Sequence, residues 1–79
     1  MQVMFFGRLG ELIARSIELD ASPETVAELR RMLAARYPDA AAELLRPSLR
    51  ACIGDDMVED AHLLAGIDAV EFLPPLSGG

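Results

Sequence analysis

The carboxyl-terminal end of the chain carries the residues best suited to chemistry. The sequence closes on Leu76-Ser77-Gly78-Gly79, so the reactive group at its tip is the α-carboxylate of Gly79. Glycine lacks a Cβ, and its backbone therefore enters slots and adopts dihedral angles that other residues do not. A Gly78-Gly79 end can thus present a carboxylate to the active site of another protein. The competing interpretation is a disordered end without a function.

Two prolines separate this end from the apolar run before it. Pro74 and Pro75 have no N–H to donate to a β-ladder, and each holds φ near about −65°. We expect them to end the last strand and to direct residues 76–79 outward, with a reach of about 13 Å for four extended residues. The sequence therefore predicts a domain of residues 1–75 and a flexible tail of residues 76–79.

Other groups capable of chemistry are few, and they form no recognisable catalytic set. Cys52 and His62 are the single thiol and imidazole, and nothing in the sequence places them in the contact that nucleophilic catalysis requires. Cys52 lies in an apolar run and is predicted to be a small buried hydrophobe. The acidic side chains between 55 and 60 match no calcium-binding loop and are interpreted as a solvated hairpin. No metal site is predicted.

Length and composition exclude several classes of function. The chain has 79 residues, which allow one domain with a modest core. Its net charge of −6 argues against a nucleic-acid partner, because nucleic-acid affinity depends on clustered Lys and Arg. A single cysteine forms no internal disulfide framework, and no apolar run reaches the length of a membrane span or resembles a signal peptide. We therefore expect a cytoplasmic protein without a membrane partner.

Hydrophobic periodicity predicts the elements that position the tail. Five short β-prone runs predict strands, at 2–6, 15–20, 49–53, 57–60 and 69–73. Ser22 and Pro23 are predicted to start one long amphipathic helix, with Arg30 off its apolar stripe, and shorter helical segments are expected at 11–14 and 39–46. We expect the first and last strands to lie parallel at the centre of a mixed sheet. This order predicts an α+β fold of the β-grasp (ubiquitin-like) class.

The opening strand carries apolar side chains on both of its faces. Val3 and Phe5 alternate with Met4 and Phe6, and one helix covers only one face of a sheet. We expect Val3 and Phe5 to lie beneath the helix. Met4, Phe6 and Leu73 would then remain on the opposite side near the tail, as a candidate docking surface. The alternative is that the short helical segments cover this face as ordinary core.

These features together resemble a known protein family along the whole chain. The opening Phe5-Phe6, the single amphipathic helix and the closing run from Val70 to Gly79 resemble the small subunits of molybdopterin synthase. Those subunits are the MoaD-type members of the MoaD/ThiS family of ubiquitin-like sulfur carriers. The specific part of the resemblance is the tail, in which Pro-Pro, an apolar residue, Ser and Gly-Gly follow an aromatic-apolar pair. The sequence departs from this pattern at Gly10 and Gly54, where such chains often carry Arg and Asn.

The resemblance implies a defined chemistry for Gly79. A carboxylate is ionised at neutral pH and is a poor electrophile, so it must be activated. In this family an E1-like adenylating enzyme uses MgATP to form an acyl-adenylate, and sulfur from a persulfide donor converts it to a thiocarboxylate. The tail then enters the large subunit of molybdopterin synthase and supplies sulfur to a pterin precursor. The chain would bind no cofactor of its own and would not be catalytic alone.

The expected partner contacts surround the tail. They are assigned to Met4, Phe6, Leu73, Pro74, Pro75, Leu76 and Ser77, with Gly78 giving access to Gly79. Two other functions stay open. A sulfur carrier for thiamine, cysteine or tRNA thiolation would share the fold and the tail. A non-catalytic ubiquitin-like interaction module would keep an unmodified end.

Overall fold

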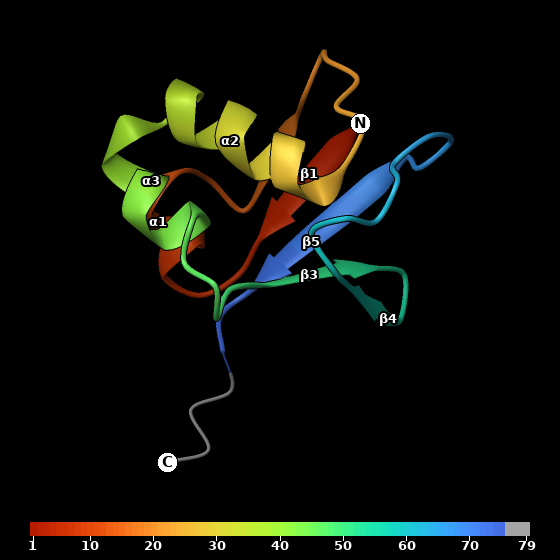
Figure 1. The fold of residues 1–79 in the computed structure, drawn as a ribbon. Coiled ribbons are helices and arrows are strands. Elements are labelled where there is room, and N and C mark those ends of the chain that lie inside the picture. Colours follow the sequence, from red (N-terminus) through yellow and green to blue (C-terminus); the bar gives the residue numbers. More distant parts are fainter. Residues whose placement is uncertain (76–79) are drawn as a thin grey trace.

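The computed structural model describes residues 1–75 and shows a five-stranded mixed sheet with its helices on one side (Figure 1). The strands are β1 (Gln2–Phe5), β2 (Ser16–Glu18), β3 (Arg50–Ile53), β4 (Asp56–Val58) and β5 (Ala69–Leu73). The helices are α1 (Arg8–Leu12), α2 (Val26–Arg36), the 3₁₀ helix η1 (Pro38–Ala40) and α3 (Ala41–Leu44). All predicted strands are present, and the first short helix begins earlier in the chain than predicted.

The first and last strands lie side by side at the centre of the sheet. The strand order is β2-β1-β5-β3-β4, and β1 and β5 are parallel while the other neighbouring strands are antiparallel. The register aligns Val3 with Val70 and Phe5 with Phe72. This parallel central pair confirms the predicted α+β fold of the β-grasp class.

The core forms where alternate side chains of the two central strands meet α2. Val3, Phe5, Val70 and Phe72 are almost completely buried, and the two phenyl rings stack with their centroids 6.1 Å apart. The apolar stripe of α2 covers them with Val26, Leu29 and Leu33. Burial of each such side chain contributes on the order of 1.5 to 3 kcal/mol. The core thus holds the last strand in place up to the point where the prolines begin.

The long helix begins later than the sequence predicted. Thr25, and not Ser22, is the N-cap, because its Oγ1 accepts a hydrogen bond from the Glu28 N–H at 3.2 Å. The Glu28 carboxylate accepts in turn from the Glu24 N–H at 3.3 Å. This is a variant of the capping box, in which Ser or Thr precedes Glu by three residues. The Thr25-to-Glu28 spacing is the signal that identifies this start.

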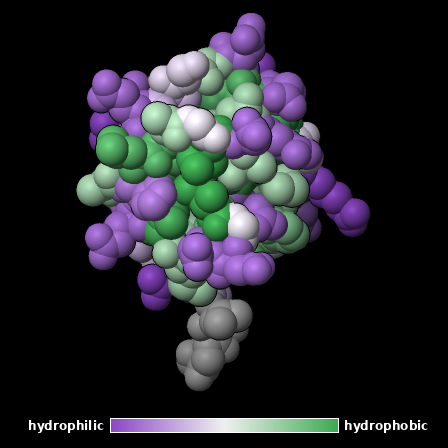
Figure 2. Space-filling view, turned by 90° about the vertical axis from the view of Figure 1, so that its right-hand side faces the viewer, coloured by the Kyte–Doolittle hydropathy of each residue, from purple (hydrophilic) through white to green (hydrophobic). Residues whose placement is uncertain are grey.

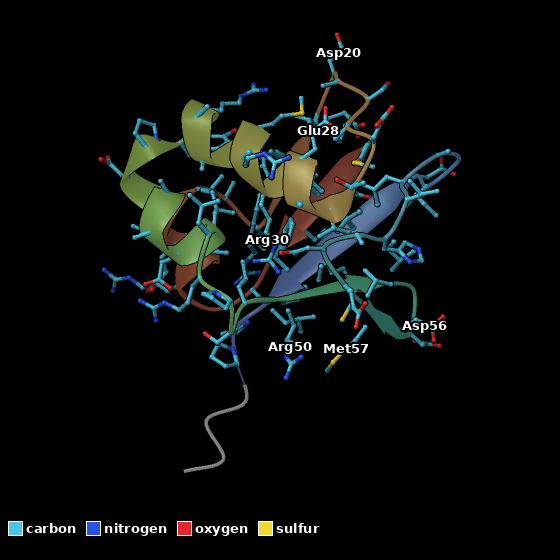
Figure 3. The ribbon with its side chains drawn as sticks, viewed as in Figure 1. Asp20, Glu28, Arg30, Arg50, Asp56 and Met57 are labelled. Atoms are coloured by element: carbon cyan, nitrogen blue, oxygen red, sulfur yellow. The ribbon has the colours of Figure 1, made fainter. Side chains whose placement is uncertain are left out.

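The position of Arg30 is a second correction. The sequence places this residue off the apolar stripe of α2, whereas its side chain is only 9% exposed and lies between α2 and the sheet (Figure 3). Its Nε donates to Asp60 Oδ1 at 2.9 Å. Its Nη atoms donate to three backbone carbonyls, those of Leu44 at 3.0 Å, Arg46 at 3.3 Å and Leu49 at 2.6 Å. These acceptors offset the cost of burying a charged group, and the largely exposed carboxylate of Asp60 is one of them.

Candidate functional site

The last strand ends where the two prolines begin, as predicted. β5 stops at Leu73, and Pro74 and Pro75 follow as exposed residues. Pro74 packs closely on Gly7, because a Cβ built on Gly7 would lie 2.9 Å from Pro74 Cγ. Gly7 also has a φ of 67°, which glycine adopts without strain. We call this end of β5, with Pro74 and Pro75, the tail exit.

The tail itself lies outside the described residues. The predicted site residues Leu76, Ser77, Gly78 and Gly79 belong to it, so the structure bears on them only through the tail exit. The other predicted contacts, Met4, Phe6, Leu73, Pro74 and Pro75, are all described. Gly7 was not among the predicted site residues, because its neighbours in the sequence give no sign of its contact with Pro74.

The side of the sheet that faces away from α2 reaches the tail exit, and we call it the open face. Because side chains alternate along a strand, the cross-strand register defines its members. One row across the sheet consists of Met4, Glu71, Cys52 and Met57. A second row pairs Leu73 with Arg50. Phe6 continues β1 beyond its last residue and is 43% exposed.

Two shallow hollows flank the tail exit and include these side chains. The larger, of about 780 Å³, is lined by Met4, Phe6, Gly7, Arg8, Glu11 and Arg15, among others. The smaller, of about 300 Å³, is lined by Ser48, Arg50, Met57, Leu73, Pro74 and Pro75. Met4, Phe6 and Leu73 therefore lie close to the start of the tail on the side predicted for them.

The short helices do not cover the open face within residues 1–75. Leu44 of α3 is fully buried in the same core cluster as Leu33 of α2, and Leu12 and Ile13 pack against that cluster as well. Figure 1 shows α3 beside α2, and α1 lies against η1 and β1. Leu45 is exposed. The alternative that these segments bury Met4 and Phe6 as ordinary core is therefore wrong.

Arginine side chains gather around the tail exit although the chain as a whole is acidic. Arg8, Arg15 and Arg50 are exposed and line the two hollows, and Figure 3 shows Arg50 extending from the sheet near the end of β5. Arg8 and Arg46 both approach Glu43, at 3.8 and 3.3 Å. Guanidinium groups form charge-assisted hydrogen bonds to carboxylates, so the arginines around the tail exit favour an acidic partner surface.

Cys52 is the thiol of the open face, and its surroundings make it unreactive. Its side chain is buried, as predicted. Burial raises the pKa of the Cys52 thiol, and the negative charge of Glu71 raises that pKa further. Since the thiolate is the nucleophile, a raised pKa of the Cys52 thiol leaves only a small fraction of it as thiolate at neutral pH.

We expect Cys52 in the folded chain to react with a small thiol reagent at least about tenfold more slowly at pH 8 than in the unfolded chain. The rate should keep rising with pH beyond the range of an ordinary cysteine, because the pKa is raised. Glu71→Gln should increase the rate by removing the nearby negative charge. Equal rates for the folded and unfolded chains in a stopped-flow labelling experiment would contradict this assignment.

Among the described residues, His, Cys, Asp and Glu form no group of three or more that could hold a metal ion. His62 and the acidic residues Asp55, Asp56 and Glu59 are exposed. None of the helices within residues 1–75 has the length and apolar content needed to cross a membrane.

Fold and site together define a β-grasp domain of the ubiquitin-like class, whose last strand leads past two prolines to the carboxyl-terminal residues. The family model of the ThiS family matches residues 3–79. The chain belongs to the ThiS family.

Individual relatives agree with this assignment. The chain is 34% identical over 80 residues to the molybdopterin synthase sulfur carrier subunit of Escherichia coli (strain K12), and the alignment covers 100% of this chain and 99% of that protein. The crystal structure of SAMP1 from Haloferax volcanii is similar in fold, with a TM-score of 0.79 and 21% identity, over 99% of this chain and 97% of that one. The second similarity supports the fold, and the first guides the functional proposal.

Proposed function

We propose that this chain is a sulfur carrier and serves in the cytosol as the small subunit of a molybdopterin synthase. The observation that carries the proposal is the similarity to the Escherichia coli sulfur carrier subunit, which spans both chains almost completely. The family match extends through Gly78 and Gly79. The proposed cargo is one sulfur atom, held as a thiocarboxylate on Gly79.

The proposed reaction begins at the carboxylate of Gly79, in the active site of an E1-like adenylating enzyme. A carboxylate oxygen attacks the α-phosphorus of MgATP and releases pyrophosphate, which gives an acyl-adenylate. A persulfide sulfur then attacks the Gly79 carbonyl carbon and displaces AMP, and a thiol reduces the resulting acyl disulfide to the thiocarboxylate. The large synthase subunit finally transfers this sulfur to the pterin precursor. Both partners supply the catalytic groups.

In this proposal the described residues present the tail and dock the partners. Pro74 and Pro75 lack the N–H groups that would extend β5, and the packing of Pro74 on Gly7 orients the start of the tail. Full burial of three exposed apolar side chains would contribute roughly 5 to 9 kcal/mol. Met4, Phe6 and Leu73 contribute less than this, because each is already partly buried in the free domain. Association costs about 4 to 15 kcal/mol, so the open face alone gives weak binding and the inserted tail must add to it.

We expect Phe6→Asp to weaken binding of the adenylating enzyme by at least about tenfold, because a carboxylate would replace an apolar contact beside the tail exit. Phe6 is exposed before binding, so the urea midpoint of unfolding should change little. Leu45→Asp is the matched control, since Leu45 is 51% exposed but lies after α3 on the helical side. Unchanged affinity for Phe6→Asp, measured by titration calorimetry, would exclude docking through Phe6.

The choice of pathway is tested by offering the thiocarboxylated chain to different acceptors. We expect sulfur to reach the pterin precursor when the large subunit of molybdopterin synthase is present. If sulfur reached only the acceptor enzymes of thiamine, cysteine or tRNA thiolation, the chain would still be a sulfur carrier, but it would serve that pathway and not molybdopterin synthesis. A chain that no adenylating enzyme modifies would instead be a non-catalytic interaction module.

A further inference from the structure

A second apolar surface lies at the end of the molecule opposite the tail exit. β1 and β5 both begin at this end, where the Gln2 N–H donates to the Asp68 carbonyl at 2.8 Å. A hollow of about 640 Å³ is lined here by residues 21–24 and 63–68 together with Met1. Pro23 and Leu64 of this lining are buried, and its other apolar members, which we call the distal patch, are Met1, Ala21, Leu63, Ala65 and Ile67. Figure 2 views the molecule from the side of the turn before β5, and hydrophobic side chains gather there within a hydrophilic border.

Among the large apolar residues of the patch Leu63 is the most exposed, and its own burial contributes little to the fold. Its side chain is 67% exposed, whereas the next residue, Leu64, is buried in the core. Leu63 forms an isolated antiparallel bridge with Thr25, and the Leu64 N–H donates to the Glu24 carbonyl at 2.9 Å. Neighbouring side chains in an extended segment point in opposite directions. The fold therefore requires an apolar residue at 64 but accepts a polar one at 63.

The walls of the hollow are held by backbone hydrogen bonds. Besides the bond to Glu24, the Val26 N–H donates to the His62 carbonyl at 3.2 Å, and the Ile67 N–H donates to the Leu64 carbonyl at 3.0 Å. A surface fixed in this way loses little conformational entropy when a ligand binds. The distal patch is thus preformed, which favours its use as a binding surface.

The charged side chains at the distal patch are acidic. Glu24 and Asp68 line the hollow and are exposed, and Asp20 lies exposed in the adjoining loop (Figure 3). The ammonium group of Met1 is paired with Glu18 at 3.1 Å and donates to the Leu19 carbonyl. No arginine is among the described residues that line this hollow. Two copies meeting here would bring like charges together, so the rim disfavours a second copy and favours a basic partner.

We propose that the distal patch docks a protein segment that carries aliphatic anchor residues flanked by Lys or Arg. The anchor contacts Leu63 and Ile67, and the basic residues pair with Glu24 and Asp68. This site lies at the opposite end of the sheet from the tail exit, so it remains accessible while the tail is engaged elsewhere. The inference is independent of the proposed sulfur chemistry.

The test uses a defined probe and the complete chain. A capped peptide with two central leucines between pairs of lysines is titrated into the isotope-labelled chain, and amide chemical shifts are followed by NMR. We expect shifts at residues 21–24 and 63–68, and weaker binding at high salt because the exposed charges are screened. The same peptide with glutamates in place of the lysines should not bind.

Matched variants separate the distal patch from other apolar positions. Leu63→Asn should weaken peptide binding by about tenfold, which corresponds to about 1.4 kcal/mol, and should leave the unfolding midpoint unchanged. Leu45→Asn, at another exposed leucine, should have no effect on peptide binding. Absence of binding at millimolar peptide, equal binding of the acidic peptide, or shifts confined to the open face would overturn the proposal. A dimer that forms in sedimentation experiments and is lost in Leu63→Asn would also overturn the proposal, because the distal patch would then bind a second copy of the chain.

Discussion

Replacement of Arg30 by methionine is expected to lower the free energy of unfolding by about 3 to 5 kcal/mol. The buried carbonyls of Leu44 and Leu49 would lose their donor, and unsatisfied buried polar groups cost about 1 to 3 kcal/mol each. The guanidinium group also lies 5.6 Å from the ring centroid of Phe72, at the centre of the core. A small domain has a total stability near the lower end of about 5 to 15 kcal/mol, so this variant should be close to unfolding. Urea denaturation followed by circular dichroism measures the change.

Two further variants identify which contacts of Arg30 matter. Arg30→Lys keeps the positive charge but loses the planar set of guanidinium N–H donors. It should lower the free energy of unfolding by less than Arg30→Met does, while remaining clearly destabilising. Asp60→Asn should cost about 1 kcal/mol or less, because the carboxylate is largely exposed and its ion pair is screened by solvent. If Arg30→Met were as stable as the original chain, the hydrogen bonds to the segment before β3 would not support the fold.

Gly78→Val is expected to reduce adenylation of Gly79 by about a hundredfold or more, since small misplacements of a reacting group have effects of this size. A β-branched side chain next to the reacting carboxylate would not enter a slot that accommodates only glycine backbone. Pyrophosphate release by the adenylating enzyme gives the rate. Ala61→Val adds the same side chain in the exposed turn after β4 and should leave the rate unchanged. Normal adenylation of Gly78→Val would show that the enzyme imposes no such slot.

The sheet was predictable because its signals are local. Alternation of apolar residues and the following Pro74 define β5, whose observed bounds, Ala69–Leu73, match the prediction. The parallel pairing of β1 and β5 followed from the order of the elements. The same alternation correctly assigned Val3 and Phe5 to the core.

Apart from the start of α2, whose signal is the local Thr25-to-Glu28 spacing, the features that the sequence did not predict depend on contacts between distant residues. Arg30 is buried because carbonyls from the segment between α3 and β3 converge on its guanidinium group, and spacing along α2 carries no information about them. The close approach of Pro74 to Gly7 likewise joins two ends of the domain. A net charge of −6 also does not predict where the charges lie, with exposed arginines near the tail exit and exposed carboxylates at the distal patch.

The central proposal, that Gly79 carries sulfur, is tested most directly by intact-mass measurement. The chain is incubated with an E1-like adenylating enzyme, MgATP, a persulfide donor and a reducing thiol. We expect a mass gain equal to the replacement of one oxygen by sulfur, located at Gly79 by fragmentation and absent when ATP is omitted. An unchanged mass, or a mass gain that persists after deletion of Gly79, would contradict the proposal.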